Sequence, residues 1–76
     1  MLKPVRCVKI EEYLRKNGYA PSANIEGVQR WDKKGYDNCI IVTCVKGWVS
    51  VTVLKSIFRN LGDNNFDNFY DFVSED

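Results

Sequence analysis

Histidine is missing from all 76 positions of the sequence. Because histidine is the commonest general base and the usual activator of a nucleophile, its absence removes most routes to acid–base and covalent catalysis. A glycine-rich phosphate loop is missing too, since the five glycines fall singly at the ends of predicted elements. We therefore expect a protein that is not an enzyme and that uses no cofactor.

Cysteines are few and widely spaced: Cys7, Cys39 and Cys44, with no CxxC pair. Cys39 and Cys44 lie five positions apart on one predicted strand, so their side chains face opposite sides of the sheet and cannot bond to each other. Three scattered thiols without an imidazole form a poor tetrahedral set for zinc. The simplest interpretation is reduced thiols in a cytoplasmic protein.

A calcium loop is also excluded, although acidic residues recur from Asp63 to Glu75. The sixth position of such a loop needs glycine and the twelfth needs glutamate, but Asn68 and Ser74 stand there. The same segment has the apolar spacing of a helix. We expect no metal site.

Long hydrophobic runs are absent, because the longest apolar stretches have the length of a strand rather than the roughly 20 residues of a membrane span. Charged residues and Pro4 interrupt the N-terminus before the apolar core of a signal peptide could build. A chain of 76 residues corresponds to one small domain, residues 1–76. We expect a soluble protein with no membrane partner.

Charge is unevenly distributed, although the net charge is only +1. All eleven basic residues and five acidic residues lie at or before Arg59, whereas five acidic residues and no basic ones follow it. A chain of this kind can offer partners two surfaces of opposite sign.

The most strongly patterned stretch is Cys39 to Leu54, where two runs rich in β-branched residues flank Lys46-Gly47. This pattern predicts a β-hairpin. Centring the turn on Lys46-Gly47 places apolar pairs on one face and a more mixed set on the other. The first set is Cys44–Val49, Val42–Val51 and Ile40–Val53, and the second is Val45–Trp48, Thr43–Ser50 and Ile41–Thr52.

Before the hairpin, the spacing of Ile10, Tyr13 and Leu14 predicts a helix over about 9–17, ended by Gly18. Its start is open: a helix from Pro4 is slightly favoured over an extended edge strand across residues 2–8. Residues 19–27 contain proline, serine, asparagine and glycine, which predicts a loop.

A short strand is predicted from Val28 to Asp32, antiparallel to residues 39–45. Two registers are open, one with Trp31 on the core face beside Ile40 and one with Val28 and Arg30 there. Burial of Trp31 removes more apolar area from water, so we favour the first register.

Two apolar stripes predict helices after the hairpin, with Thr52 as a cap for the first and Asp63, Asn64 or Asn65 for the second. The stripes are Leu54, Ile57, Phe58 and Leu61, closed by Gly62, and then Phe66, Phe69, Tyr70 and Val73. The expected fold is α+β: a three-stranded antiparallel meander covered on one face by an N-terminal helix and C-terminal helical segments.

A helix that ends in Asn17, Gly18 and Tyr19 and precedes three strands and a helix is similar to the arrangement of HicA-type toxins, which share a double-stranded-RNA-binding-domain-like order. Those toxins rely on a strand histidine for RNA cleavage, and this chain has none. The basic final helix of double-stranded-RNA-binding domains is contradicted by Asp67 and Asp71. The chain is assigned to neither family.

Nucleic acid is one candidate ligand, because basic and aromatic side chains alternate around the turn after Val28 and can hold phosphates and stack bases. The residues are Arg30, Trp31, Lys33, Lys34, Tyr36 and, across the sheet, Lys46. The alternative is a solvated turn beside one buried tryptophan.

An unidentified protein is the favoured partner. Trp48 on the mixed sheet face and Phe72 off the helical stripe are candidate anchors, and Asp67 and Asp71 add acidic charge that suits a basic groove. We expect a regulator, adaptor or inhibitor of another protein, by analogy with small proteins of phages and mobile elements. A free sheet edge, in the N-terminal segment or at residues 28–32, would also permit a homodimer.

Overall fold

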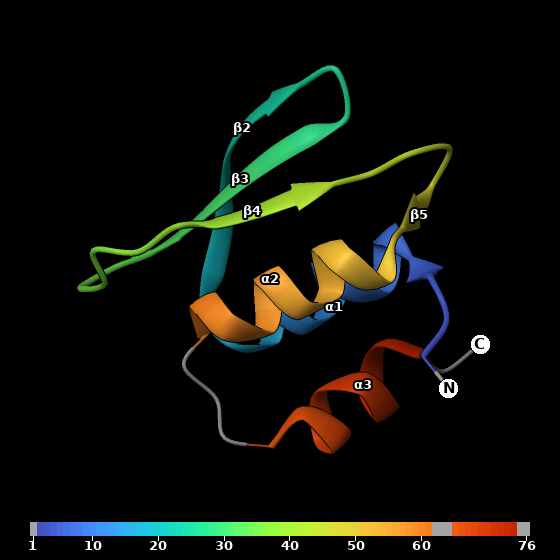
Figure 1. Cartoon of the computed structure of the whole chain (residues 1–76). Helices are drawn as coiled ribbons and strands as arrows, with labels where there is room; N and C mark the ends of the chain where they lie inside the picture. The colour runs from blue at the N-terminus through green and yellow to red at the C-terminus, as the bar shows by residue number, and fades with distance from the viewer. Residues whose placement is uncertain (1, 62–64, 75–76) are drawn as a thin grey trace.

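The computed structural model describes residues 2–61 and 65–74. The elements are β1 (Val5–Arg6), α1 (Cys7–Lys16), β2 (Tyr19–Ile25), β3 (Val28–Lys33), β4 (Ile40–Thr43), β5 (Trp48–Val49), α2 (Val51–Leu61) and α3 (Phe66–Ser74). A three-stranded antiparallel sheet has the order β2-β3-β4, and β1 and β5 form a separate two-stranded sheet. Helices α1 and α2 contact the larger sheet. Helix α3 packs against α1 on the side that faces away from the larger sheet (Figure 1). The predicted fold class, an antiparallel meander covered by helices, is confirmed.

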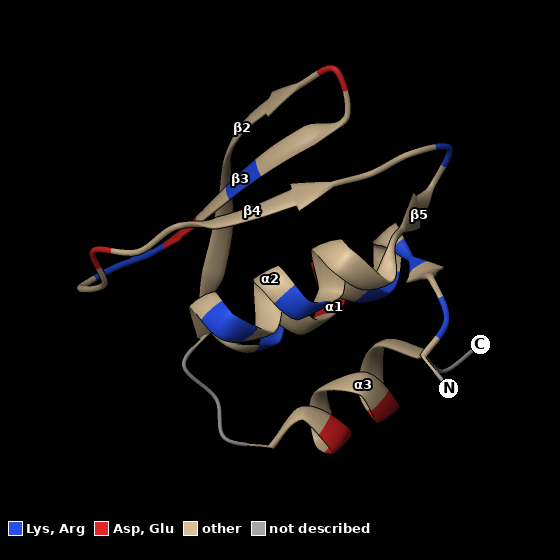
Figure 2. Ribbon diagram, in the orientation of Figure 1, with Lys and Arg blue, Asp and Glu red and all other residues tan. Residues whose placement is uncertain are grey.

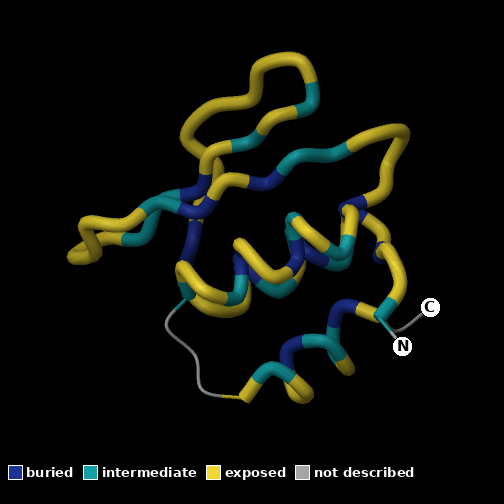
Figure 3. The backbone as a smooth tube through the Cα atoms, in the orientation of Figure 1, coloured by how far each residue is buried: buried dark blue, intermediate teal, exposed yellow. Residues whose placement is uncertain are grey.

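The buried residues form one core cluster, with members on both sheets and on all three described helices (dark blue in Figure 3). Trp31 pairs with Ile40, and only 1% of its surface is exposed. The favoured register and the burial of Trp31 are therefore both confirmed. Because β3 is hydrogen-bonded to β2 on one side and β4 on the other, the prediction of a free edge at 28–32 is wrong.

The loop predicted over residues 19–27 is wrong in most of its length, because Tyr19–Ile25 forms strand β2. Pro21 is tolerated because β2 is an edge strand, and the register shifts between Pro21 and Ala23. Every residue of β2 except Tyr19 is exposed. The strand consequently lacks the alternation of apolar and polar residues that marks a half-buried strand.

The predicted hairpin is only partly correct. The turn at Lys46-Gly47 forms, and Val45 and Trp48 exchange two main-chain hydrogen bonds of 2.9 Å. The three apolar pairs predicted beyond it are wrong, because Val49 pairs with Val5 of β1 and α2 begins at Val51. Burial of Leu54 and Ile57 on one helical face outweighs the strand preference of the β-branched residues.

The start of α2 is capped by Ser50, whose hydroxyl accepts a hydrogen bond from the Val53 N–H at 3.3 Å. The predicted cap, Thr52, lies inside the helix instead. In α3 the predicted cap Asn65 is confirmed by a 3.1 Å bond from the Asn68 N–H to its side-chain oxygen. The other predicted caps, Asp63 and Asn64, and the helix stop at Gly62 lie outside the described residues.

The N-terminal helix begins at Cys7, so the favoured start at Pro4 is wrong and the extended alternative is correct for Val5 and Arg6. Val5 is buried opposite Val49, which explains why a valine lies off the helical stripe. The end of α1 agrees with the prediction, since Gly18 follows Asn17 with a φ of 89°.

Reduced thiols were the wrong expectation for two of the three cysteines. Cys7 and Cys44 form a disulfide across 37 positions, whereas Cys39 is free. The start of α1 and the end of β4 bring their Cα atoms to 6.0 Å, which lies within the usual range for a disulfide. Cys39 and Cys44 do not bond to each other, as expected.

Candidate protein-binding surface

Trp48 is held at the surface by a tight turn. Lys46 and Gly47 both have positive φ values, 52° and 84°, as a type I′ turn requires. Glycine suits the second position because it adopts this conformation without steric cost. Trp48 also pairs with Arg6 of β1, so two neighbouring strands fix its position.

The side chain of Trp48 remains 45% exposed. The Arg6 guanidinium carbon lies 5.0 Å from the centre of its ring, close enough for a cation–π interaction. Such a contact restrains the indole while leaving part of it open to a partner.

Two hollows flank Trp48 and share Trp48 and Pro4 as lining residues. The first, of about 270 Å³, is bounded by the N-terminal segment and the last turn of α3. The second, of about 240 Å³, lies toward α2 and the end of β4. The first is lined by Lys3, Pro4, Val5, Arg6, Trp48, Tyr70, Val73 and Ser74. The second is lined by Pro4, Thr43, Val45, Trp48, Ser50 and Val53.

The walls of the first hollow are joined by a hydrogen bond from the main-chain N–H of Lys3 to the hydroxyl oxygen of Tyr70, 2.9 Å long. This bond links the segment before β1 to α3, far apart in the sequence. The hollow is therefore formed by the tertiary fold and not by one local stretch.

The disulfide joins the two chain segments that carry Arg6 and Trp48. Cys7 follows Arg6, and Cys44 precedes the turn that carries Trp48. The Cys7 N–H also donates to the carbonyl oxygen of Gly47 at 2.9 Å. Strand pairing, a hydrogen bond and a covalent bond thus hold Arg6 and Trp48 together.

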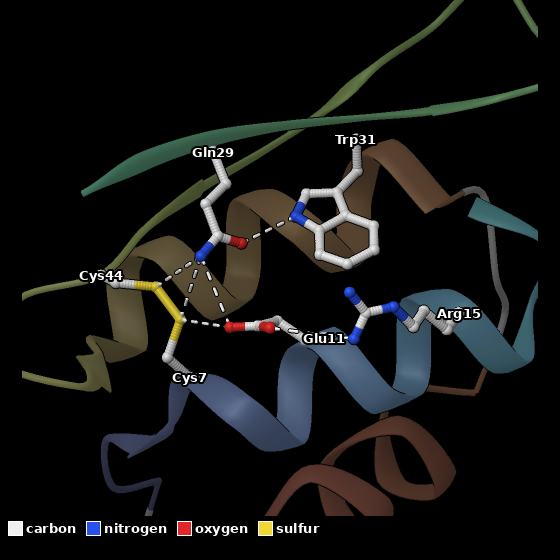
Figure 4. Close-up of polar contacts among 6 residues, drawn as sticks. All are labelled: Cys7, Glu11, Arg15, Gln29, Trp31 and Cys44. Atoms are coloured by element: carbon white, nitrogen blue, oxygen red, sulfur yellow. Dashed lines mark hydrogen bonds and ion pairs between the residues drawn. A yellow bond between two sulfur atoms is a disulfide. The ribbon is translucent and has the colours of Figure 1, made fainter. Parts of the chain in front are cut away.

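Gln29 lies at the centre of a polar cluster beside the disulfide (Figure 4). Its amide nitrogen is 3.7 Å from the Cys44 sulfur, 3.9 Å from the Cys7 sulfur and 3.4 Å from a Glu11 carboxylate oxygen. Its amide oxygen accepts a 2.8 Å hydrogen bond from the Trp31 indole N–H. Because a bonded sulfur carries no proton, the 3.6 Å approach of Cys7 to Glu11 is a contact and not a donated hydrogen bond. Gln29 thereby satisfies the polar group of the buried tryptophan.

The other predicted protein-binding residues lie on α3. Phe72 is half-buried, with its ring 5.4 Å from that of Tyr13 and the Lys16 ammonium 5.0 Å above it. Asp67 and Asp71 are exposed, and the acidic residues of α3 are red in Figure 2. None of these three residues lines the two hollows beside Trp48. The structure thus separates Trp48 from the acidic side of α3.

The residues predicted to bind nucleic acid do not form one surface. Trp31 is buried and cannot stack a base, so that part of the hypothesis is wrong. Arg30 pairs with Asp32 at 3.4 Å. Lys33, Lys34 and exposed Tyr36 lie at or beyond the end of β3, whereas Lys46 lies in the turn beyond the other end of β4 (Figure 2).

Lys33 contacts two tyrosine rings, with its ammonium 4.6 Å from the centre of the Tyr36 ring and 5.6 Å from that of Tyr19. Burial raises the pKa of the Tyr19 hydroxyl, and the neighbouring Tyr36 adds a smaller effect in the same direction. This shift moves ionisation of the Tyr19 hydroxyl to higher pH.

Sequence reasoning missed Lys3, Pro4 and Arg6 as neighbours of Trp48. The available signal was Val5, which falls off the helical stripe and indicates an extended segment there. An extended segment still does not reveal its partner, since the pairing of β1 with β5 joins residues more than 40 positions apart.

In residues 2–61 and 65–74, no three cysteine or carboxylate side chains meet as potential metal ligands. None of the helices in this part of the chain combines the length and the apolar character that a membrane crossing requires. No family model matches the sequence, and comparison with curated proteins and with solved structures found no significant match.

Proposed function

We propose that this chain is a small protein-binding module that acts as a regulator, adaptor or inhibitor of another protein, with Trp48 at the centre of its binding surface. The observation that carries the proposal is an exposed tryptophan, held by Arg6 and a tight turn, between two hollows. Tryptophan and arginine are enriched among the residues that dominate binding energy at protein interfaces. The absence of histidine supports a function without catalysis.

Trp48 is a better anchor than Phe72. Phe72 packs against Tyr13 under Lys16, so its truncation would also disturb the contact between α1 and α3. Asp67 and Asp71 remain candidates for a second, acidic contact on α3.

The test is affinity capture from the source cell with wild-type protein, Trp48→Ala and Tyr36→Ala. Tyr36 is the matched control, because it is an exposed aromatic residue, 59% accessible, that follows β3 and lines neither hollow beside Trp48. Trp48→Ala should lose the captured protein while Tyr36→Ala retains it. Retention by Trp48→Ala, with its fold intact by circular dichroism, would overturn the proposal.

Nucleic-acid binding is the second candidate function, supported by the grouping of Lys33, Lys34 and exposed Tyr36 at one end of the sheet. A gel-shift series across salt concentration tests it. Binding that weakens steeply with salt and with Lys33→Ala plus Lys34→Ala supports it, whereas no shift at low salt removes it.

The cytoplasmic location and the homodimer are parts of the proposal that rest on the sequence, and the phage or mobile-element origin rests on analogy with other small proteins. The disulfide adds a condition to the cytoplasmic location. Disulfides in the cytoplasm are usually transient, catalytic or redox-sensing. A cytoplasmic location therefore requires that the Cys7–Cys44 bond respond to the reducing power of that compartment.

A further inference from the structure

The two hollows beside Trp48 differ in chemistry, and this difference indicates what binds there. Lys3 and Arg6 border the first hollow, which gives it positive charge. The second is bordered by Pro4, Val45 and Val53 and by two neutral hydroxyl residues. A ligand that spans Trp48 thus meets a cationic site on one side and an apolar site on the other.

The cations of the first hollow are not neutralised by the described part of the chain. In that part, ion pairs are formed by Lys9, Arg15 and Arg30. Among the same residues, the lining of neither hollow includes a carboxylate. Lys46 adds a further positive charge in the adjacent turn (Figure 2). The complementary ligand is anionic.

The second hollow decides between an anionic peptide and a nucleic acid. Arg6 already lies over the Trp48 ring, which obstructs the stacking of a base at that position. The aliphatic groups of Val45 and Val53 suit an apolar side chain and give no partner for a phosphate. A peptide can supply both groups from neighbouring residues.

We propose that the surface around Trp48 binds a short acidic segment of a partner protein. An apolar side chain of that segment packs beside Pro4, Val45 and Val53, and its carboxylates pair with Lys3 and Arg6. This inference rests on the proposed function and identifies the class of partner.

The probe is a displayed library of random twelve-residue peptides, selected on the 76-residue chain. Enriched peptides should combine aspartate or glutamate with one large apolar residue. The strongest of them is then synthesised and titrated against variants by fluorescence anisotropy.

Two matched pairs of variants test the two sites separately. Arg6→Gln should weaken the peptide by roughly tenfold or more, through loss of a charge-assisted contact. Arg6→Lys should lose less, because it keeps the charge. Arg59→Gln, which removes an exposed arginine on α2 outside both hollows, should change affinity less than about twofold.

Val45→Thr should weaken binding, whereas the control Val28→Thr, another exposed valine, should not.

Enriched peptides without excess acidic residues would overturn the inference, as would equal effects of Arg6→Gln and Arg59→Gln. Tighter binding of a single-stranded oligonucleotide, with the same sensitivity to Arg6→Gln, would assign the surface to nucleic acid instead. If capture of the partner depends on Trp48 but not on Arg6, the inference of an acidic ligand is refuted and the proposed function is not. A partner that does not depend on Trp48 refutes the proposed function itself.

Discussion

Gly27 and Cys44 contact each other through their main chains. The Cys44 N–H donates to the carbonyl oxygen of Gly27 at 2.8 Å. A β-carbon added to Gly27 would lie 2.8 Å from the carbonyl oxygen of Cys44. The turn between β2 and β3 therefore packs directly on the segment that carries one half of the disulfide.

Gly27→Ala should destabilise the fold more than Gly35→Ala. Both glycines have positive φ values, 84° and 86°, so each substitution costs about 1–2 kcal/mol in backbone conformation. Only the side chain at position 27 also collides with a main-chain atom, since position 35 faces open space. Urea unfolding of the two variants measures the difference, and equal losses of unfolding free energy would contradict the contact.

The two tryptophans should differ in their contributions to stability. Trp31→Ala removes a fully buried side chain and should cost about 3–5 kcal/mol, which can unfold a domain of this size. Trp48→Ala should cost about 1 kcal/mol, because Trp48 is 45% exposed and the Arg6 guanidinium that lies over its ring is itself at the surface. Chemical denaturation gives both values, with Trp31→Phe as a milder variant that stays folded.

Fluorescence distinguishes the same two residues without unfolding the protein. Iodide should quench the emission of Trp48 and leave that of Trp31 nearly unchanged. In Trp48→Phe the remaining emission should resist quenching. Strong quenching in that variant would show that Trp31 is accessible.

Reduction of the disulfide should lower stability by about 4 kcal/mol, the loop-closure estimate for a separation of 37 residues. Urea unfolding with and without a reductant measures the loss, and Cys39→Ser should leave it unchanged. Thiol titration of the unfolded protein should find one thiol before reduction and three after it. Three thiols without reductant would exclude the bond.

Stability should also fall in alkali because of Tyr19. Burial raises the pKa of its hydroxyl above the ordinary value of 10.0, so the folded state retains this proton to a higher pH than the unfolded chain. The contribution is complete below pH 10 and is lost as the pH rises through the higher, folded-state pKa. Tyr19→Phe should therefore lose less unfolding free energy than wild type between about pH 9 and 11. Equal losses would contradict the shift.

The sequence predicted the fold best where apolar residues repeat with a clear period. The stripe from Leu54 to Leu61 and the burial of Trp31 beside Ile40 follow from such patterns. The β-branched side chains of residues 51–53 favour a strand, but these residues form the first turn of α2, whose buried face holds Leu54 and Ile57. Strand β2 could not be recognised, since it is an exposed edge strand without alternation.

The candidate surface was only partly predictable for a different reason. Trp48 was identified because the turn and its pair Val45 are local in sequence. Arg6 and the two hollows depend on the pairing of β1 with β5 and on the contact of Lys3 with Tyr70. Such long-range contacts leave no periodic signal in a single sequence.

The Cys7–Cys44 bond closes residues 7–44, which include α1 and the three strands of the larger sheet, into a covalent ring, with α2 and α3 on the chain outside it. If the two ends of the protein are pulled apart, force passes through the sulfur bridge and bypasses the residues within the ring. Single-molecule stretching should therefore extend only the parts of the chain outside the ring until a reductant is added. The ring should then release about 130 Å of hidden contour length, from 37 residues at roughly 3.5 Å each.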